Sequence, residues 1–303
     1  MIGEHIEKYI EIKRSLGFKY RVQATLLRSY ARFAEIRGDQ FVYTKTVLEW
    51  ATLAPSRAQR RNRLLTIRRF ALVMSADDQR HQIPPDIFFG KQTFKRRKAF
   101  IFTDEQIARL LRSAAELKPI GSIRPACYTT LFGLIAATGL RISEALALSL
   151  DDISQDGLII QSTKFNKSRL VPIHETVQDK LEWYLKRRKK VSASDRAVFV
   201  SHGGKSLKYS TVVGVFLQLA RSIGLREGPG IPGPTIHDLR HTFAVRSLEQ
   251  CHRNEDNSAQ HISSLSTYLG HAHITDTYWY LQAAPRLMKD IAQESQLHFG
   301  GNE

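Results

Sequence analysis

The sequence predicts a mainly α-helical protein with two domains: an all-helical N-terminal domain and a mostly helical second domain with a small antiparallel β-sheet. Apolar residues follow helical spacing in residues 1–88, beginning with Ile6, Tyr9 and Ile10 at i, i+3 and i+4. A strand–turn–strand pattern is concentrated in residues 157–173. A chain of 303 residues is long enough for two domains.

Residues 1–88 are predicted to form four successive helices. The first ends before Gly17, the second contains Leu27, and the third begins at about Val47. The fourth extends from Ser56 to Met74. The candidate buried residues of the fourth helix are apolar: Leu64, Leu65, Ile67 and Val73.

Arginines gather on one face of this fourth helix. Arg57, Arg61 and Arg68 are spaced i, i+4 and i+11, and such a face can lie along a phosphate backbone. A solvated helix surface is the alternative explanation for the same pattern. We predict these three arginines as nucleic-acid contacts.

A basic linker at residues 89–99 is predicted to separate the two domains. Pro84 and Pro85 are expected to stop the preceding helix, because proline cannot continue it. The second domain then covers residues 100–303. Further nucleic-acid contacts are expected from linker side chains: Lys95, Arg96 and Arg97. Such a linker between two domains suits a C-shaped clamp that closes around a duplex.

Helix boundaries are well marked at the start of the second domain. Thr103 is predicted to cap a helix. A long apolar helix from about Arg124 to Thr138 ends at Gly139, which can adopt the left-handed conformation of a helix C-terminus. Arg141 then begins the next helix, beside backbone N–H groups that also favour an anion. Glu144 lies in the first turn, where it can brace that arginine.

The rest of the second domain mixes strands and helices. The predicted hairpin has a first strand at residues 158–163 and a tip at residues 164–168. A helix is expected over residues 174–190, and a short apolar strand over residues 197–200. Thr235 is expected to cap a helix that carries two histidines.

The net charge of +16 is distributed unevenly along the chain. Residues 51–100 contain 12 Lys and Arg against 3 Asp and Glu, whereas residues 251–303 contain 3 against 6. Positive charge concentrated in one segment favours a polyanion-binding face over an ordinary solvated surface.

Composition also excludes several classes of protein. Cys127 and Cys251 are too few for a disulfide framework or a cysteine-based zinc site, and they fit a reducing cytoplasmic setting. The most apolar stretch, Leu131 to Leu150, contains Arg141 and Glu144, each of which would cost about 2–3 kcal/mol at a bilayer centre. We therefore predict a buried helix pair and no membrane association. The N-terminal residues lack the apolar core of a signal peptide.

His237, Arg240 and His241 share one face of a predicted helix, and three explanations compete for them. Metal binding is one, but the motif lacks the glutamate and the further ligands of a zinc site, so a metal is not expected. Histidines packed in a core are the second. The third is phosphoryl transfer, in which the arginine holds phosphate oxygens and His237 transfers a proton.

Phosphoryl transfer is favoured because the rest of the required chemistry is present. Arg141 and Arg240 supply planar, permanently charged groups that can hold both non-bridging oxygens. Lys164, in the hairpin tip, is a candidate acid for the leaving 5′ oxygen. Tyr280, nine residues after His271, is the candidate nucleophile that would form a covalent phosphotyrosine.

Two neighbours compete with these assignments. Tyr278 precedes Tyr280 by two residues, and helical geometry would point it about 200° away, so its expected role is packing. Lys167 lies near Lys164 in the hairpin tip and carries the same charge.

The order and spacing of these residues resemble the tyrosine recombinases, the phage-integrase family of DNA strand-exchange enzymes. The family pattern is Arg, Lys, His-x-x-Arg, His or Trp, and Tyr. Here the pattern is complete: Arg141, Lys164, His237, Arg240, His271 and Tyr280. The resemblance covers most of residues 100–285 and, more weakly, the N-terminal third. It favours Lys164 over Lys167 and a structural role for His241.

The resemblance implies site-specific cutting and rejoining of duplex DNA through a 3′-phosphotyrosyl intermediate. Four protomers would act on two DNA sites, whereas the free protein would be monomeric and nucleoid-associated. Residues 283–299 would form a terminal helix that either packs on its own domain or, as the resemblance favours for the DNA-bound state, docks on a neighbouring protomer. The resemblance also implies that the chemistry needs no metal and no high-energy cofactor. The sequence Tyr278-Trp279-Tyr280-Leu281 resembles recombinases of mobile elements.

Other classes stay open at this point. A type IB topoisomerase would share the chemistry but relax supercoils without a target site. A non-catalytic DNA-binding relative would bind without forming a covalent adduct. A metalloprotein that used the histidines would lose activity in a chelator.

Overall fold

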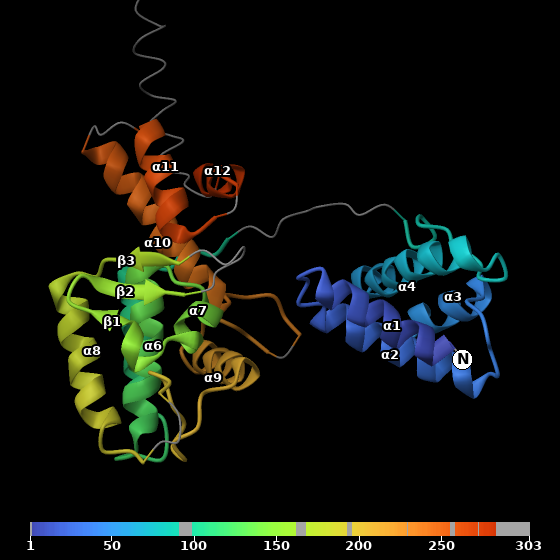
Figure 1. Ribbon diagram of the computed structural model, residues 1–303. Helices are drawn as coiled ribbons and strands as arrows, with labels where there is room; N and C mark the ends of the chain where they lie inside the picture. The colour runs from blue at the N-terminus through green and yellow to red at the C-terminus, as the bar shows by residue number, and fades with distance from the viewer. Residues whose placement is uncertain are drawn as a thin grey trace, which may run out of the picture. The chain divides into compact units, whose positions relative to one another are not determined.

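The computed structural model describes residues 2–90, 99–161, 168–192, 196–228, 230–254, 258–271 and 273–282. The chain divides into two compact units, Met1–Arg96 and Arg97–Glu303, and each has its own hydrophobic core (Figure 1). The predicted fold class is confirmed, because helices predominate and a three-stranded antiparallel sheet is the strand structure that the described residues contain.

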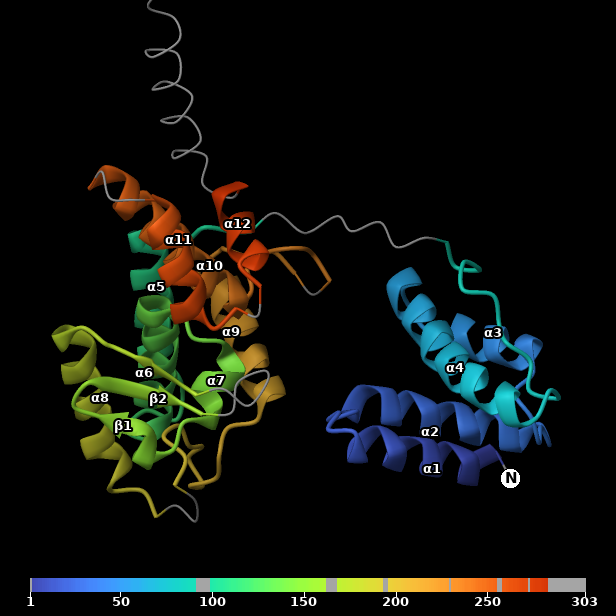
Figure 2. The ribbon, with the colours of Figure 1, turned by 45° about the horizontal axis from the view of Figure 1, so that its top comes forward.

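The first unit is a group of helices: α1 (Ile2–Ser15), α2 (Arg21–Ile36), α3 (Thr44–Thr52) and α4 (Arg57–Asp77). α1 packs against α2, and α4 packs against both α2 and α3 (Figure 2). Ile6, Leu27 and Phe70 are fully buried between them, and the Tyr30 ring meets Trp50 edge to face. Burial of these apolar side chains is the main force that holds the unit together.

Helix α4 differs from the prediction at its end and on its buried side. It ends at Asp77, three residues beyond the predicted end at Met74, and in the turn that follows the Asp78 carboxylate accepts hydrogen bonds from the backbone N–H and guanidinium of Arg80. Val73, predicted as buried, is 43% exposed, and Phe70 fills the core in its place.

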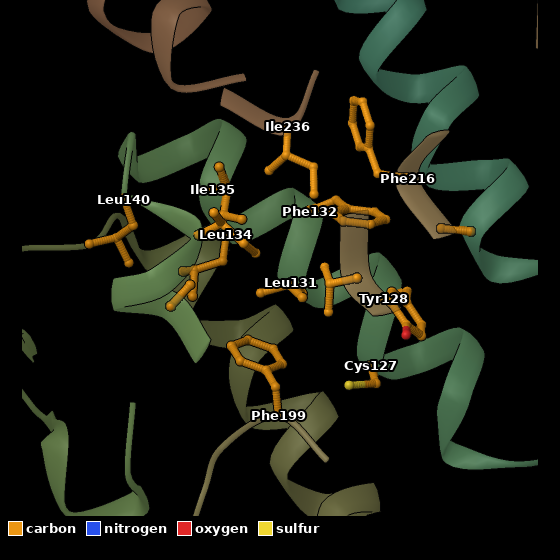
Figure 3. Packing of buried hydrophobic residues seen from close by; sticks show 14 of the residues in the cluster. Cys127, Tyr128, Leu131, Phe132, Leu134, Ile135, Leu140, Phe199, Phe216 and Ile236 are labelled. Carbon is orange, nitrogen blue, oxygen red and sulfur yellow. The ribbon is translucent and has the colours of Figure 1, made fainter. Parts of the chain in front are cut away.

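The second unit is built around α6 (Ile123–Thr138), which packs against α5, α8 and α10. Figure 3 shows Leu131, Phe132 and Ile135 of this helix facing apolar side chains such as Phe199 and Phe216. The other helices of the unit are α5 (Asp104–Ala115), α7 (Ile142–Ala147), α8 (Glu175–Arg188), α9 (Tyr209–Ser222), α10 (Ile236–Arg253), α11 (Ser258–Leu269) and α12 (Thr275–Gln282), with a 3₁₀ turn at Leu150–Asp152.

The sheet has the strand order β1 (Ile153–Ser154), β2 (Gly157–Ile160) and β3 (Arg169–Val171). Leu158 of β2 pairs with Val171 of β3 in an antiparallel register, which confirms the predicted hairpin. Most of the predicted tip, including Lys164 and Lys167, lies outside the described residues, as does the predicted tail at 283–299.

The predicted boundaries around α5 to α7 are confirmed. Thr103 caps α5 in a capping box with Gln106. Gly139 ends α6 with a φ of 62°, a left-handed conformation that glycine adopts without strain. Arg141 is the N-cap residue of α7, and Glu144 accepts a hydrogen bond from its backbone N–H.

The strand predicted at residues 197–200 is wrong. These residues make only single bridges, between Ser149 and Ala197 and between Val200 and Ser206. Side chains of α8 satisfy part of this backbone, since the Tyr184 hydroxyl donates to the Val198 carbonyl. The apolar run therefore reflects burial in the core and not pairing within a sheet.

Both cysteines, Cys127 and Cys251, are buried thiols without a disulfide bond. Among the described residues, no helix combines the length and the apolar character that crossing a bilayer requires.

Candidate active site

The C-terminus of α11 is the point at which the predicted site residues meet. Leu269 ends the helix, Gly270 follows with a φ of 67°, and His271 comes next. The N–H of Gly270 donates to the Thr267 carbonyl and the N–H of His271 to the Ser266 carbonyl, the two bonds of a Schellman motif. This Leu-Gly-His sequence therefore fixes the position of His271 by local backbone chemistry.

Arginine side chains satisfy the carbonyls that this motif leaves open. The Leu269 carbonyl accepts hydrogen bonds from Arg141 Nη1 at 3.3 Å and from Arg240 Nη2 at 2.7 Å. The Gly270 carbonyl accepts from Arg141 Nη2 at 2.9 Å. Because a helix C-terminus carries partial negative charge, it can hold two guanidinium groups close together despite their mutual repulsion.

Arg240 extends from α10 into the interior and is only 1% exposed. Its Nη1 donates to the Gly139 carbonyl at 2.7 Å, so the end of α6 also orients it. Burial, together with the positive charge of Arg141, lowers the pKa of Arg240 to about 10. The group thus stays charged at neutral pH in a buried position, where charge is screened less than in water.

Glu144 lies between Arg141 and Arg169. It accepts from Arg141 Nη1 at 2.7 Å and from Arg169 Nη2 at 2.8 Å. Burial alone would raise the pKa of Glu144, but the hydrogen bonds and charges of Arg169 and Arg141 outweigh burial and lower it. Glu144 is therefore ionised and braces the arginine, as the sequence predicts.

The protonation of His271 follows from its two partners. Arg240 Nη2 lies 3.0 Å from His271 Nε2, and an arginine can only donate, so Nε2 accepts. The proton of the neutral ring is then on Nδ1, which donates to Thr277 Oγ1 at 2.7 Å. Burial, followed by the charges of Arg240 and Arg141, lowers the pKa of His271 to about 4. The imidazole is therefore neutral at physiological pH.

The depressed pKa of His271 predicts a pH-dependent stability. The unfolded chain takes up a proton near the usual pKa of 6.5, before the folded protein does, so the free energy of unfolding is expected to fall as the pH drops from 6.5 towards 4. Above pH 6.5 this residue contributes no pH dependence. Urea unfolding at several pH values, in wild type and His271→Asn, measures the contribution as a difference between the two slopes.

The difference between the two proteins isolates His271 from other titrating groups, including His237, whose pKa is also lowered. Besides Arg240 and Arg141, the charged groups that act on the ring are Asp276 and Arg169. Identical pH dependence in wild type and His271→Asn would contradict a lowered pKa and a neutral ring for His271 in the folded protein.

Tyr280 lies on α12 and is 3% exposed. The His271 ring stacks near it with a centroid distance of 5.9 Å, and the His241 ring lies 5.4 Å from it. Tyr280 is close enough to Arg240 that its ionised form would raise the pKa of that arginine. Tyr278 is 47% exposed, in agreement with its expected position on the opposite side of the helix.

His237 and His241, near the start of α10, differ in their surroundings. His241 packs between the rings of His237 and Trp279, with centroid distances of 4.5 and 4.6 Å. His237 keeps access to solvent, but partial desolvation and the nearby charge of Arg240 lower its pKa. The described residues contain no group of three or more His, Cys, Asp or Glu side chains arranged to hold a metal ion.

The structure brings together all the predicted catalytic residues that it describes: Arg141, His237, Arg240, His271 and Tyr280. Lys164 lies outside the described residues. Sequence reasoning missed Thr277 and Arg169. Arg169 pairs with Ile160 across the hairpin, and Ile160 is buried. An arginine opposite an apolar residue in the predicted hairpin is the signal that could have singled out Arg169.

Gly139 accepts a hydrogen bond from Arg240 through its carbonyl, and its Cα lies close to side chains of other helices. A Cβ at Gly139 would lie 2.5 Å from the Phe243 ring and 3.0 Å from Leu269. We expect Gly139→Ala to lower the free energy of unfolding by about 2–4 kcal/mol, from left-handed strain and overpacking together. Gly121→Ala is the matched control, since Gly121 also has a positive φ but no atom within 4 Å of a Cβ. Equal losses in urea unfolding would contradict the packing argument.

The arginines predicted as nucleic-acid contacts have intramolecular partners in the first unit. Arg57, Arg61 and Arg68 donate hydrogen bonds to the carbonyls of Phe89, Gly90 and Pro84. They therefore hold the segment after α4 against this helix, a role that the sequence did not suggest. The other predicted contacts, Lys95, Arg96 and Arg97, lie outside the described residues.

Comparison with known proteins identifies the family. The sequence model of the phage integrase family matches residues 101–286, more than half of the chain. The chain belongs to the phage integrase family. The resemblance inferred from the residues is thus confirmed, and the chain is a tyrosine recombinase.

Relatives of this recombinase match it over nearly the full length in one case and over about three fifths of the chain in another. y4rB of Sinorhizobium fredii, which is named as an integrase/recombinase, is 40% identical over 298 residues, covering 94% of each chain. The tyrosine recombinase XerD of Halalkalibacterium halodurans is 32% identical over 195 residues, covering 62% of this chain and 59% of that protein.

Solved structures of recombinases share the fold. The Tn1549 transposon integrase in complex with transposon right end DNA has a TM-score of 0.65 and 18% identity, covering 99% of both chains. A lambda integrase dimer bound to a COC′ core site has a TM-score of 0.63 and 17% identity, covering 93% of this chain and 77% of that one.

Proposed function

We propose that this tyrosine recombinase cleaves and rejoins duplex DNA at a specific site through a 3′-phosphotyrosyl intermediate. The observation that carries the proposal is the shared Leu269 carbonyl, which places the guanidinium groups of Arg141 and Arg240 side by side next to Tyr280. Two adjacent, oriented cations beside a buried phenol suit the binding of a phosphodiester and an attack on its phosphorus.

Each residue of the site would take one part of the reaction. The Tyr280 oxygen attacks phosphorus, the bond from phosphorus to the 5′ oxygen breaks, and a 3′-phosphotyrosine forms. Arg141 and Arg240 hold the non-bridging oxygens. His237 accepts the phenol proton, and Lys164 supplies a proton to the 5′ oxygen. Rejoining is the reverse, with a 5′ hydroxyl as nucleophile, and it needs no cofactor because the phosphotyrosine keeps the bond energy.

His271 would act chiefly on Arg240. Its neutral Nε2 accepts from Arg240 while its ring stacks on Tyr280, so it links the phosphate-binding group to the nucleophile. Thr277, on the same helix as Tyr280, fixes the ring in the tautomer that this contact requires.

Binding of duplex DNA would involve both units. Residues 1–88 would form a DNA-binding domain, residues 89–99 a basic linker, and residues 100–303 the catalytic domain of a clamp around the duplex. The net charge of +16 supports a polyanionic partner. We propose Arg57, Arg61 and Arg68 as phosphate contacts, because a guanidinium is positively charged and carries five N–H donors.

A role in integrating or excising a mobile element is supported by the likeness to an integrase of a transposon. Lambda integrase has been solved as a tetramer bound to a Holliday junction. We propose the same number of protomers on two sites for this recombinase, a monomer when it is free, and the nucleoid as its place of action.

Trapping on a nicked duplex tests the proposal. Duplexes that bind the protein tightly are first selected from a randomised library. A single nick is then placed a few nucleotides to the 3′ side of each central phosphodiester, so that cleavage releases a short fragment with a 5′ hydroxyl, which diffuses away and cannot rejoin. A covalent adduct in EDTA, resolved on a denaturing gel, is the expected result. Tight binding without an adduct at any nick would point to a non-catalytic relative. Relaxation of supercoiled plasmids that lack the selected sequence would point to topoisomerase activity.

A further inference from the structure

Arg169 lies in β3 and contacts two other elements of the second unit. Its Nε donates to the Tyr268 carbonyl at 2.8 Å, in the last turn of α11. Its Nη1 and Nη2 donate to the two carboxylate oxygens of Glu144 at 3.2 and 2.8 Å. The guanidinium also lies against Gly270, where a Cβ would be 2.7 Å from Nη1. Arg169 therefore joins the sheet to α7 and to the end of α11, the elements that position Arg141 and His271.

Arg141, Glu144 and Arg169 together carry two positive charges and one negative charge. Glu144 is one carboxylate between Arg141 and Arg169, and both guanidinium groups form ion pairs with it. If Glu144 faced Arg141 alone, its negative charge would neutralise the cation that has to meet the phosphate. Sharing Glu144 leaves the trio with a net charge of +1. The side chain of Arg169 is 12% exposed and that of Glu144 is 9% exposed, so solvent screens this balance only weakly.

The two ion pairs differ in where their arginines face. The side chain of Arg141 is 33% exposed, against 12% for Arg169. Arg141 thus keeps access to a ligand, whereas Arg169 is enclosed by its protein partners. This division suits a pair in which one arginine meets the substrate and the other holds the shared carboxylate.

We propose that Arg169 is a positioning residue for catalysis: by sharing Glu144 with Arg141, it fixes the orientation of Arg141 and keeps the positive charge of Arg141 available to the phosphate. Arg169 itself does not touch the DNA in this scheme. The inference rests on the proposed function, since it assigns Arg169 a part in the binding of the scissile phosphate.

An ordinary buried ion pair predicts a different outcome. Removing one partner of such a pair lowers stability by leaving an unpaired charge, and it would slow the reaction by the same factor on any substrate. If Arg169 acts through the charge of Arg141, the loss in rate on removing Arg169 should instead depend on the charge of the phosphate. A methylphosphonate has a neutral methyl group in place of one non-bridging oxygen, so its transition state carries less negative charge and needs less stabilisation.

The experiment measures adduct formation by Arg169→Gln on two forms of the selected nicked duplex, one with a normal scissile phosphodiester and one with a methylphosphonate there. We expect a loss of about 10–100-fold against wild type on the phosphodiester and less than about 5-fold on the methylphosphonate. DNA affinity, measured by anisotropy, is expected to change less than the rate. Arg169→Lys, which keeps the charge but not the forked geometry, is expected to recover part of the rate.

Equal losses on the two substrates would overturn the proposal, because the defect would then not depend on the phosphate charge. An unchanged rate on the phosphodiester would also overturn it. If Arg169→Gln fails to fold by circular dichroism, the same comparison is made with Arg169→Lys, for which the larger loss is again expected on the phosphodiester. Failure of the proposed function is recognised separately, since wild type would then form no adduct with the phosphodiester.

Discussion

Replacing Tyr280 with phenylalanine is expected to abolish the covalent adduct, with a loss of about 10⁴-fold or more in the rate of strand cleavage. The substitution removes one oxygen from a side chain that is 3% exposed and leaves the ring in place between His241 and His271. We therefore expect DNA affinity and thermal stability close to those of wild type. The measurement is trapping on the selected nicked duplex, with binding measured in parallel.

Tyr278→Phe is the matched control, since it makes the same chemical change two residues away on the same helix. The side chain of Tyr278 is 47% exposed, and full adduct formation is expected from this variant. An adduct that survives in Tyr280→Phe and disappears in Tyr278→Phe would reverse the assignment of the nucleophile.

Arg240→Lys is expected to reduce cleavage by about 10²–10³-fold while the protein still binds DNA. Lysine keeps one positive charge, but a single ammonium group cannot reproduce the forked contacts to Gly139, Leu269 and His271 at once. Some stability should also be lost, about 1–3 kcal/mol, because a buried carbonyl is left without its donor. Single-turnover cleavage and urea unfolding measure the two effects separately.

The more exposed arginine of the site separates catalysis from stability more cleanly. The Arg141 side chain is 33% exposed, so Arg141→Ala is expected to lose cleavage with a smaller loss of stability than Arg240→Lys. Arg196→Lys is the control, because Arg196 forms an ion pair with Asp151 in which both side chains are largely exposed. Cleavage by Arg240→Lys or Arg141→Ala at the rate of Arg196→Lys would contradict the role of these arginines in catalysis.

Local signals in the sequence were sufficient for much of the fold. Thr103 and Gly139 mark helix ends through backbone chemistry that acts within a few residues, and both were predicted correctly. The apolar run at residues 197–200 was misread, because buried residues that bond to α8 have the same composition as a strand. Helix α4 continues three residues beyond its predicted end at Met74.

For the site, the sequence determined the family and the candidate residues, because the order and spacing of Arg141, His237, Arg240, His271 and Tyr280 are properties of the chain itself. The sequence also placed His271, since a glycine after Leu269 closes a Schellman motif locally. Only the tertiary structure decided which groups hold the arginines. The sequence cannot single out the carbonyls of Gly139 and Leu269, because every residue has a carbonyl and both residues are far from Arg240 in the chain. The sharing of Glu144 by Arg141 and Arg169 is of the same kind, because ion pairs between distant segments form only after packing brings the segments together.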